Sequence, residues 1–390
     1  MSYTPAPLIM FLKELPDPRE RGSSCDHSFV DILVIAICAI ISGAETWEDM
    51  QEYGEEKEDW LSSFLELRCG IPSHDTFYRV FCLLNPDKFQ ECFTRWVRSA
   101  YPEALDTPDG NTEIIPIDGK AIKGSRGKGK GKKAVHIVSA WSTKLSLVLG
   151  QKKVDQKSNE ITAVPQLLEA INLKGAMITA DAISCQKSIA ETCVNQEADY
   201  LLAVKGNQKT LYQDILTAIE KHWHHHSKDA ISDKFYEQKN TGHGRHKYRS
   251  CWVFDDLSAL STSGDWAGIK QFSVVQSDRT MGGKATTALR FYISSKVLNA
   301  KDTLHATRQH WEVENNLHWM LDIAFNEDAC QTKEEHAAEN LSTLRRIALN
   351  ILKADITSKR SIKTKRKKAG WSNKYLAQLL SMFILGAKCE

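Results

Sequence analysis

The chain has 390 residues, 42% of them hydrophobic and 26% charged, with a formal net charge of +2. These values are ordinary for a soluble globular protein, and the length allows two or three domains with a well-buried core. Ten cysteines without a CxxC pair exclude a disulfide framework and predict reduced thiols in the cytoplasm. Met1–Arg21 does not resemble a signal peptide, and the apolar run Ile32–Ile41 is too short to span a bilayer, so no membrane association is expected.

Positive charge is concentrated in two segments, although the total is nearly balanced. Such clusters are typical of proteins that bind a polyanion. The alternative interpretation is a solvated linker and a solvated tail. The first cluster contains Lys120, Lys123, Arg126, Lys128, Lys130, Lys132 and Lys133, and the second contains Lys359, Arg360, Lys363, Lys365, Arg366, Lys367 and Lys368.

Residues 1–105 are predicted to be helical. Asp31 can begin a helix that ends near Gly43. Thr46 is a candidate N-cap, with Asp49 completing an approximate capping box, and opens a predicted helix over Trp47–Leu67.

A short break then precedes a helix over His74–Leu84, capped by Ser73. Its polar residues resemble the entry to a helix-turn-helix recognition helix that could contact DNA. The alternative is an ordinary bundle helix with Phe77 in the core. A further helix is predicted from Pro86.

From about residue 112 the pattern changes to strands that alternate with helices. The order β-β-β-α-β-α-β, followed by a helix, is that of a ribonuclease-H-like fold. In that order the first and fourth strands are neighbours. The predicted strands are Ile114–Asp118, Ala134–Trp141, Leu145–Val154, Ala176–Asp181 and Asp199–Val204, and the helices are Ile161–Ile171 and Gln186–Gln196.

The segment Gln208–Leu304 is too long for a loop and is predicted to form a small β-rich subdomain. Its strand-like runs are Cys251–Phe254, Gln271–Gln276 and Leu289–Ser294. Helices are expected around Glu314 and over residues 335–353 and 371–385.

We therefore predict an α/β fold with a ribonuclease-H-like mixed sheet, flanking helices and a β-rich insertion, preceded by an all-α domain. The predicted boundaries are 1–108 for the helical domain, 109–355 for the α/β domain with its insertion at about 209–300, and 356–390 for a basic segment and a last helix.

Three acids are the candidate catalytic residues. Asp118 and Asp181 each end a predicted strand, and Glu314 lies in a Trp-rich helical stretch. Two or three carboxylates can hold Mg²⁺ together with a substrate phosphate, and two ions about 4 Å apart can promote phosphoryl transfer on DNA. Helical spacing places His310, Glu314 and His318 on one face and predicts that the Trp side packs inward.

Each acid also has an ordinary interpretation. A strand-end Asp is often a turn or cap residue, and a helical Glu often lies on a solvated face. The spacing His310-x₃-Glu314-x₃-His318 would also suit a transition metal.

Seven motifs together resemble the H-repeat-associated proteins, a family of bacterial insertion-sequence transposases with a DDE catalytic triad. The resemblance covers nearly the whole chain. The motifs are Ile117-Asp118-Gly119-Lys120, Asp155-Gln156-Lys157-Ser158-Asn159-Glu160-Ile161-Thr162-Ala163, Thr179-Ala180-Asp181-Ala182, Ala203-Val204-Lys205-Gly206-Asn207-Gln208, Tyr292-Ile293-Ser294-Ser295, His310-Trp311-x-Val313-Glu314-Asn315-x-Leu317-His318-Trp319 and Asn326-Glu327-Asp328.

The resemblance implies a ribonuclease-H-like core that cuts and joins DNA with Mg²⁺ or Mn²⁺, through two ions. Asp118, Asp181 and Glu314 match the three catalytic, metal-binding acids. The expected partner is double-stranded DNA, at the element ends and at the target, bound by a homodimer. Candidate DNA contacts are Lys120, Lys123, Arg126, Lys205, Asn207, His310 and His318.

The chain departs from related transposases in two places. Their Tyr-x₂-Arg-x₃-Glu-x₆-Lys signature reads Thr307, His310, Glu314 and Leu321 here, so phosphate contacts from that helix do not follow. In the segment His243–Arg249, which resembles His-Gly-Arg-x-Glu-x-Arg, Lys247 occupies the Glu position.

Three functions stay open on the sequence. The first is an active transposase, the second is a DNA-binding relic or regulator without cleavage, and the third is a structure-specific nuclease that cuts without joining.

Overall fold

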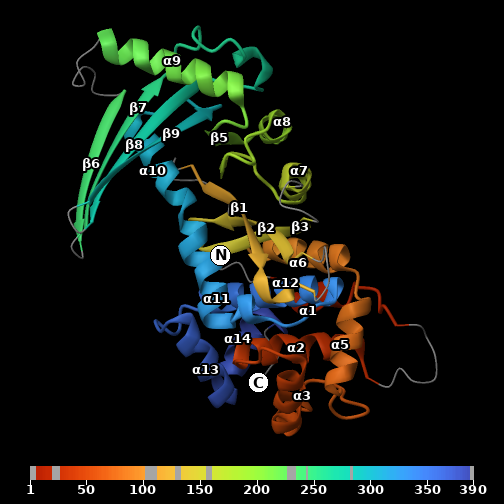
Figure 1. The fold of residues 1–390 in the computed structure, drawn as a ribbon. Coiled ribbons are helices and arrows are strands. Elements are labelled where there is room, and N and C mark those ends of the chain that lie inside the picture. Colours follow the sequence, from red (N-terminus) through yellow and green to blue (C-terminus); the bar gives the residue numbers. More distant parts are fainter. Residues whose placement is uncertain are drawn as a thin grey trace, which may run out of the picture.

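The computed structural model describes residues 6–19, 27–101, 112–127, 133–154, 160–225, 234–242, 245–281 and 284–386. In these ranges the protein is a mixed α/β molecule built on one sheet, with the strand order β3-β2-β1-β4-β5-β9-β8-β7-β6. The N-terminal helices gather at one end of this sheet, and the strands of the insertion extend the other end (Figure 1).

The N-terminal region is helical, as the sequence predicts. Thr46 and Asp49 form the expected capping box. The helix predicted over Trp47–Leu67 is instead two short helices, because four carboxylates crowd the residues around Lys57 and repel one another at helical spacing. The helices are α1 (Leu8–Leu12), α2 (Phe29–Ser42), α3 (Trp47–Glu56), α4 (Glu58–Leu61), α5 (His74–Leu83) and α6 (Pro86–Ala100).

The first five strands adopt the predicted order. β1 pairs antiparallel with β2 and parallel with β4, so the first and fourth strands are neighbours. The elements are β1 (Ile114–Ile122), β2 (Val135–Ser142), β3 (Leu147–Val154), α7 (Glu160–Ala170), β4 (Met177–Ala180), α8 (Lys187–Asn195) and β5 (Asp199–Val204).

The described residues of the segment predicted to form a small β-rich subdomain contain a helix and four strands. β9 pairs antiparallel with β5, with Leu202 opposite Ile293, so the four inserted strands continue the central sheet. Sequence patterns detected only the buried inner half of three strands, because the outer halves carry mainly polar, exposed side chains. The elements are α9 (Lys209–His225), β6 (Phe235–Gly242), β7 (Arg245–Phe254), β8 (Gln271–Met281) and β9 (Lys284–Ser294).

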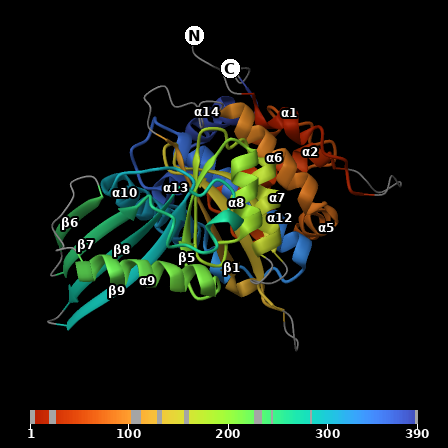
Figure 2. The ribbon, with the colours of Figure 1, turned by 90° about the horizontal axis from the view of Figure 1, so that it is seen from above.

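Helices α9 and α10 cover opposite faces of these extended strands (Figures 1 and 2). Trp223 of α9 packs edge-on against Trp252 of β7, with ring centroids 5.7 Å apart. On the other face, Leu304 of α10 (Ala300–His310) packs in a cluster with Cys251 and Val253. Alternate residues of β7 therefore point to different helices.

The stretch that carries Glu314 is not one continuous α-helix. A π-helical turn, Glu314–His318, separates α10 from α11 (Trp319–Phe325). A π turn adds a residue to the repeat and rotates the residues after it about the helix axis. The prediction that the Trp side packs inward is wrong, because Trp311, before the turn, is 40% exposed and Trp319, after it, is 56% exposed.

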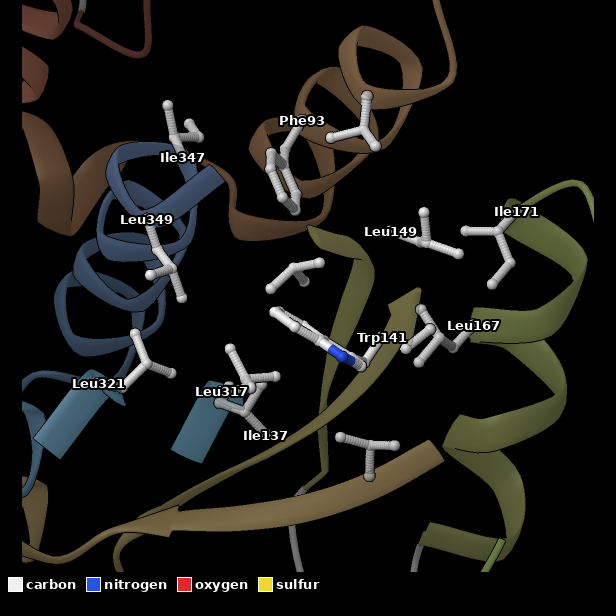
Figure 3. Packing of buried hydrophobic residues seen from close by; sticks show 14 of the residues in the cluster. Phe93, Ile137, Trp141, Leu149, Leu167, Ile171, Leu317, Leu321, Ile347 and Leu349 are labelled. Atoms are coloured by element: carbon white, nitrogen blue, oxygen red, sulfur yellow. The ribbon is translucent and has the colours of Figure 1, made fainter. Parts of the chain in front are cut away.

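The main hydrophobic core joins the sheet to the helices around it. Trp141 of β2 is fully buried and lies between the helix α7 and the helix α12 (Figure 3). Phe93 of α6 and Leu317 of the π-helical turn contribute to the same cluster. The remaining helices are α12 (Glu335–Ala354), α13 (Ile362–Trp371) and α14 (Asn373–Phe383).

The C-terminal basic cluster is partly structural, which excludes the solvated-tail interpretation for α13. Arg366 is buried and donates hydrogen bonds to the carbonyl oxygens of Ile40, Ala44 and Ala324. Ile40 belongs to the last turn of α2, where helical carbonyls lack partners within the helix, and Ala44 follows its C-cap Gly43.

No single helix among the described residues is long and apolar enough to cross a membrane. Within the described part of the chain, the pair α2 and α3, bent by 95°, is the one that satisfies the criteria of length and composition.

Replacing Arg366 by Met is expected to lower the free energy of unfolding by about 2–4 kcal/mol, because buried carbonyls lose a charged donor. Urea unfolding measures this change. The matched control is Lys367→Met on the exposed side of α13, which should change stability by less than about 0.5 kcal/mol. Equal effects of the two substitutions would show that the guanidinium does not stabilise the end of α2.

Candidate active site

Asp118 and Asp181 lie side by side at one edge of the strand pair β1–β4. Ile117 is opposite Ala180 in the parallel register, and β4 ends at Ala180. The next residue on each strand is therefore an aspartate, and neighbouring strands are about 4.8 Å apart. Asp118 is not at a strand end as predicted, because β1 continues to Ile122. Because β4 ends at Ala180, no residue of β4 pairs with Asp118.

Glu314 reaches the same region from the π-helical turn. The pKa of Asp118 is raised to about 7, mainly by burial. A hydrogen bond from the Gly119 amide opposes this rise, and the carboxylates of Asp181, Glu314 and Glu160 contribute to it. The predicted acids therefore share one electrostatic environment, although they come from two strands and a helix.

Backbone amides fix the two aspartates. Gly119 N donates to Asp118 Oδ1 at 2.9 Å. The amides of Ile183 and Ser184 donate to Asp181 Oδ1 at 3.1 and 3.4 Å. One oxygen of each carboxylate thus accepts hydrogen bonds from its own loop or strand.

The pair His136 and Glu160 was not identified as part of the site from the sequence. His136 Nε2 and Glu160 Oε1 are 2.7 Å apart, and both residues are buried. A Cβ on Gly119 would lie 2.5 Å from His136 Nε2 and 2.7 Å from Glu160 Oε1. Glycine is therefore required beside Asp118 so that this pair can approach. The sequence does contain one indication of this pair, because His136 interrupts the apolar run Val135–Val138.

Two histidines near the acids, His310 and His318, are held in the neutral form by burial. His318 Nδ1 lies 3.5 Å from Asp118 Oδ2, and burial lowers the pKa of His318 to about 3. His310 Nδ1 lies 3.1 Å from Thr179 Oγ1, and burial lowers the pKa of His310 to about 4. With these pKa values neither imidazole carries a charge at neutral pH, and the DNA contacts predicted for the two residues stay predictions.

Among the described residues, no three His, Cys, Asp or Glu side chains converge into a group that could hold a metal ion. This does not favour the transition-metal alternative for His310, Glu314 and His318. Mg²⁺ has a different requirement, because it binds through one or two carboxylates and takes its other ligands from waters and substrate phosphates. The adjacent carboxylates of Asp118 and Asp181 fit that requirement.

Lys120 is buried and connects the strand β1 to the segment after Glu314. Its Nζ lies 2.7 Å from Asp322 Oδ1, 2.7 Å from Asp328 Oδ1 and 3.4 Å from Glu327 Oε2. Glu327 is fully buried and also pairs with Arg346 of α12 at 3.0 Å. Lys120 therefore connects the parts of the site, and the DNA contact predicted for it stays a prediction.

The other predicted DNA contacts lie around the site. Lys123 is 80% exposed while pairing with Asp328, and Arg126 is exposed after it. Lys205 is exposed in the loop after β5. Asn207 donates to the Ala182 carbonyl at 2.6 Å and so braces the segment that follows Asp181.

Some sequence predictions concern residues outside the described ranges. They are Lys128, Lys130 and Lys132 of the first basic cluster, the motif residues 155–159, and His243 and Gly244.

Comparison with known proteins identifies the family. The family model "Transposase DDE domain" matches residues 109–351, and the model "DDE_Tnp_1-associated" matches residues 9–97. The chain is 40% identical over 384 residues to "H repeat-associated putative transposase YhhI" of Escherichia coli (strain K12), covering 96% of this chain and 97% of that protein. It is 38% identical over 378 residues to "Putative transposase YncI" of Escherichia coli O157:H7, with 96% and 94% covered.

Among solved structures, the "Cryo-EM structure of piggyBac transposase synaptic complex with hairpin DNA" matches with a TM-score of 0.38 and 11% identity, over 98% of this chain and 84% of that chain. This likeness is too weak to support a conclusion. The two family models and the relatives that match along almost their whole length agree with one another. The chain belongs to the DDE transposase family and is similar to its H-repeat-associated members.

Proposed function

We propose that this protein is a DNA transposase with a ribonuclease-H-like core and the catalytic acids Asp118, Asp181 and Glu314. The register of β1 and β4 carries the proposal, because it makes two carboxylates adjacent where β4 ends. The order β3-β2-β1-β4-β5, with β4 and β5 parallel to β1, supports the fold assignment.

The reaction is two in-line displacements at phosphorus. Water attacks a phosphodiester at the element end and releases a 3′-OH, which then attacks a target phosphodiester. Each displacement forms one P–O bond and breaks one, without a covalent enzyme intermediate. Two Mg²⁺ ions, or Mn²⁺ in their place, would activate the attacking oxygen and stabilise the leaving oxygen.

The chain's own residues prepare this site. Asp118, Asp181 and Glu314 would hold the ions, and the hydrogen bonds to Asp118 and Asp181 limit the rotation of these two carboxylates. Lys123, Arg126 and Lys205 are exposed and suited to backbone phosphates. We further propose that a homodimer holds two element ends, since cutting and joining require paired ends.

Asp118→Asn and Glu314→Gln are each expected to reduce Mg²⁺-dependent nicking at least about a hundredfold, because metal ions supply several kcal/mol of transition-state stabilisation. The substrate is DNA that carries the inverted repeats flanking the gene, and denaturing gels follow cleavage and strand transfer. Glu169→Gln, at an exposed site on α7, is the matched control.

The outcome separates the three functions. Variants that cut as well as the parent would show that the acids are wrongly assigned. A parent that binds DNA without metal-dependent cleavage would be a relic or regulator. Cut ends without joined products would indicate a nuclease.

The raised pKa of Asp118 predicts how stability depends on pH without metal. The unfolded carboxyl group ionises near its ordinary pKa of 3.8, whereas the folded one keeps its proton to about pH 7. Between these values the native state binds more protons, so rising pH destabilises it. In EDTA, Asp118→Asn should therefore melt at a higher temperature than the parent at about pH 8, with the difference disappearing near about pH 4.

Added Mg²⁺ at the higher pH should raise the melting temperature of the parent and leave that of Asp118→Asn nearly unchanged, because a cation favours the ionised carboxylate. Differential scanning fluorimetry measures both effects. Equal Mg²⁺ shifts in the two proteins would contradict a role for Asp118 in binding the ion.

A further inference from the structure

A positively charged groove lies on the outer part of the extended sheet, beside the helix that leads to Glu314. Its volume is about 840 Å³, and side chains from β7, β8, β9 and α10 line it. Glu314 and Asn315 lie among the lining residues, so the groove reaches the candidate active site. Its cationic residues are Lys247, Arg249, Arg279, Arg290 and Arg308.

The strand register places these cations on one face. Lys247 is opposite Arg279, and Val275 is opposite Arg290. Arg249 is two residues before Cys251, whose side chain packs toward α10. The inner half of this face is thus apolar and covered by α10, whereas the outer half carries the cations.

Three guanidinium groups in the groove have no acidic partner. Among the described residues, no carboxylate lies within ion-pair distance of Arg249, Arg290 or Arg308, although Glu312 and Glu314 line the groove. Arg249 Nη1 is buried without a hydrogen-bond partner. Burial lowers the pKa of Arg249, and the charges of Arg308 and Arg290 lower it further.

The neighbouring contacts orient two of these groups without neutralising them. Arg308 Nη1 donates to Gln238 Oε1 at 2.6 Å, and this amide is uncharged. The guanidinium of Arg290 lies over the ring of Trp311, 4.9 Å from its centroid. Unpaired positive charges held in place by neutral groups form a site prepared for an anion.

We propose that Arg249, Arg290 and Arg308 bind backbone phosphates of the DNA and direct the strand toward Glu314. This inference rests on the proposed function, because it takes DNA as the substrate. Guanidinium groups suit the site, since each can donate two hydrogen bonds to one phosphate. The proposal also gives a role to the His243–Arg249 segment, whose last residue is one of the three arginines.

The spacing suits a strand that passes from the groove to the acids. Arg308 and Glu314 are six residues apart, which corresponds to roughly 9 Å along a helix. Successive nucleotides of duplex DNA rise by about 3.4 Å. For a duplex whose axis runs along α10, this length corresponds to about three base pairs between Arg308 and Glu314.

The test is binding of a short fluorescein-labelled DNA duplex in EDTA, followed by fluorescence anisotropy over a range of salt concentrations. Arg249→Gln and Arg308→Gln should each weaken binding several-fold and make the slope of log K against log salt shallower by about 0.9. Arg249→Lys should keep the slope, because it keeps the charge. Lys174→Gln, which removes an exposed cation paired with Glu197, is the control and should bind like the parent.

Thermal melting without DNA provides a second measurement. Removing one of three mutually repelling guanidiniums should leave the melting temperature unchanged or raise it. If each variant that binds DNA more weakly also melts at a lower temperature than the parent, the proposal is overturned, because the arginines would then be structural. The proposal would also fail if both Gln variants bound DNA with the parent's affinity and slope, and the transposase assignment would stand. A parent that binds no DNA would contradict the proposed function and this inference together.

Discussion

The arrangement of the candidate site depends on the ion pairs of the buried Lys120 ammonium group. Lys120 is two residues beyond Asp118, so the two side chains share a face of β1. Its ion pairs connect this strand to Asp322 of α11 and to Asp328 in the turn after α11. Glu327 adds a link to Arg346 of α12, and Arg346 and Lys120 keep the pKa of Glu327 low although its burial acts in the opposite direction. Separating these elements would leave buried charges unpaired, which costs several kcal/mol.

The adjacency of Asp118 and Asp181 could be predicted from the sequence because it depends on topology alone. Parallel strands joined through helices in this order place the first beside the fourth, whatever the details of packing. The orientation of Trp319 relative to the residues before the turn depends instead on one extra residue in a π turn, which spacing at 3.6 residues cannot detect. The outer halves of β7, β8 and β9 escaped prediction because neither face is apolar there. Buried polar residues such as Glu160 and Arg366 escaped it because their partners are distant in the chain.

Two groups of like charge meet near Glu314, with carboxylates on one side and guanidinium groups on the other. Each group is destabilising by itself, and the two are not arranged to neutralise each other. Lys120 shows that the same chain can pair buried charges closely where only stability is required. Charges left unpaired next to such a network are consistent with selection for binding over stability.

The direct pairing of β9 with β5 puts the groove strands β7, β8 and β9 into one hydrogen-bonded sheet with β1 and β4, which position Asp118 and Asp181. Their separation is therefore set by the spacing of strands, not by the length of a connecting loop. In the proposed complex with DNA, this spacing would set the distance along the bound strand between the arginines and the position of cutting. The loop between β7 and β8 can change in length without altering that distance, whereas a shift of register between β5 and β9 would move the position of cutting.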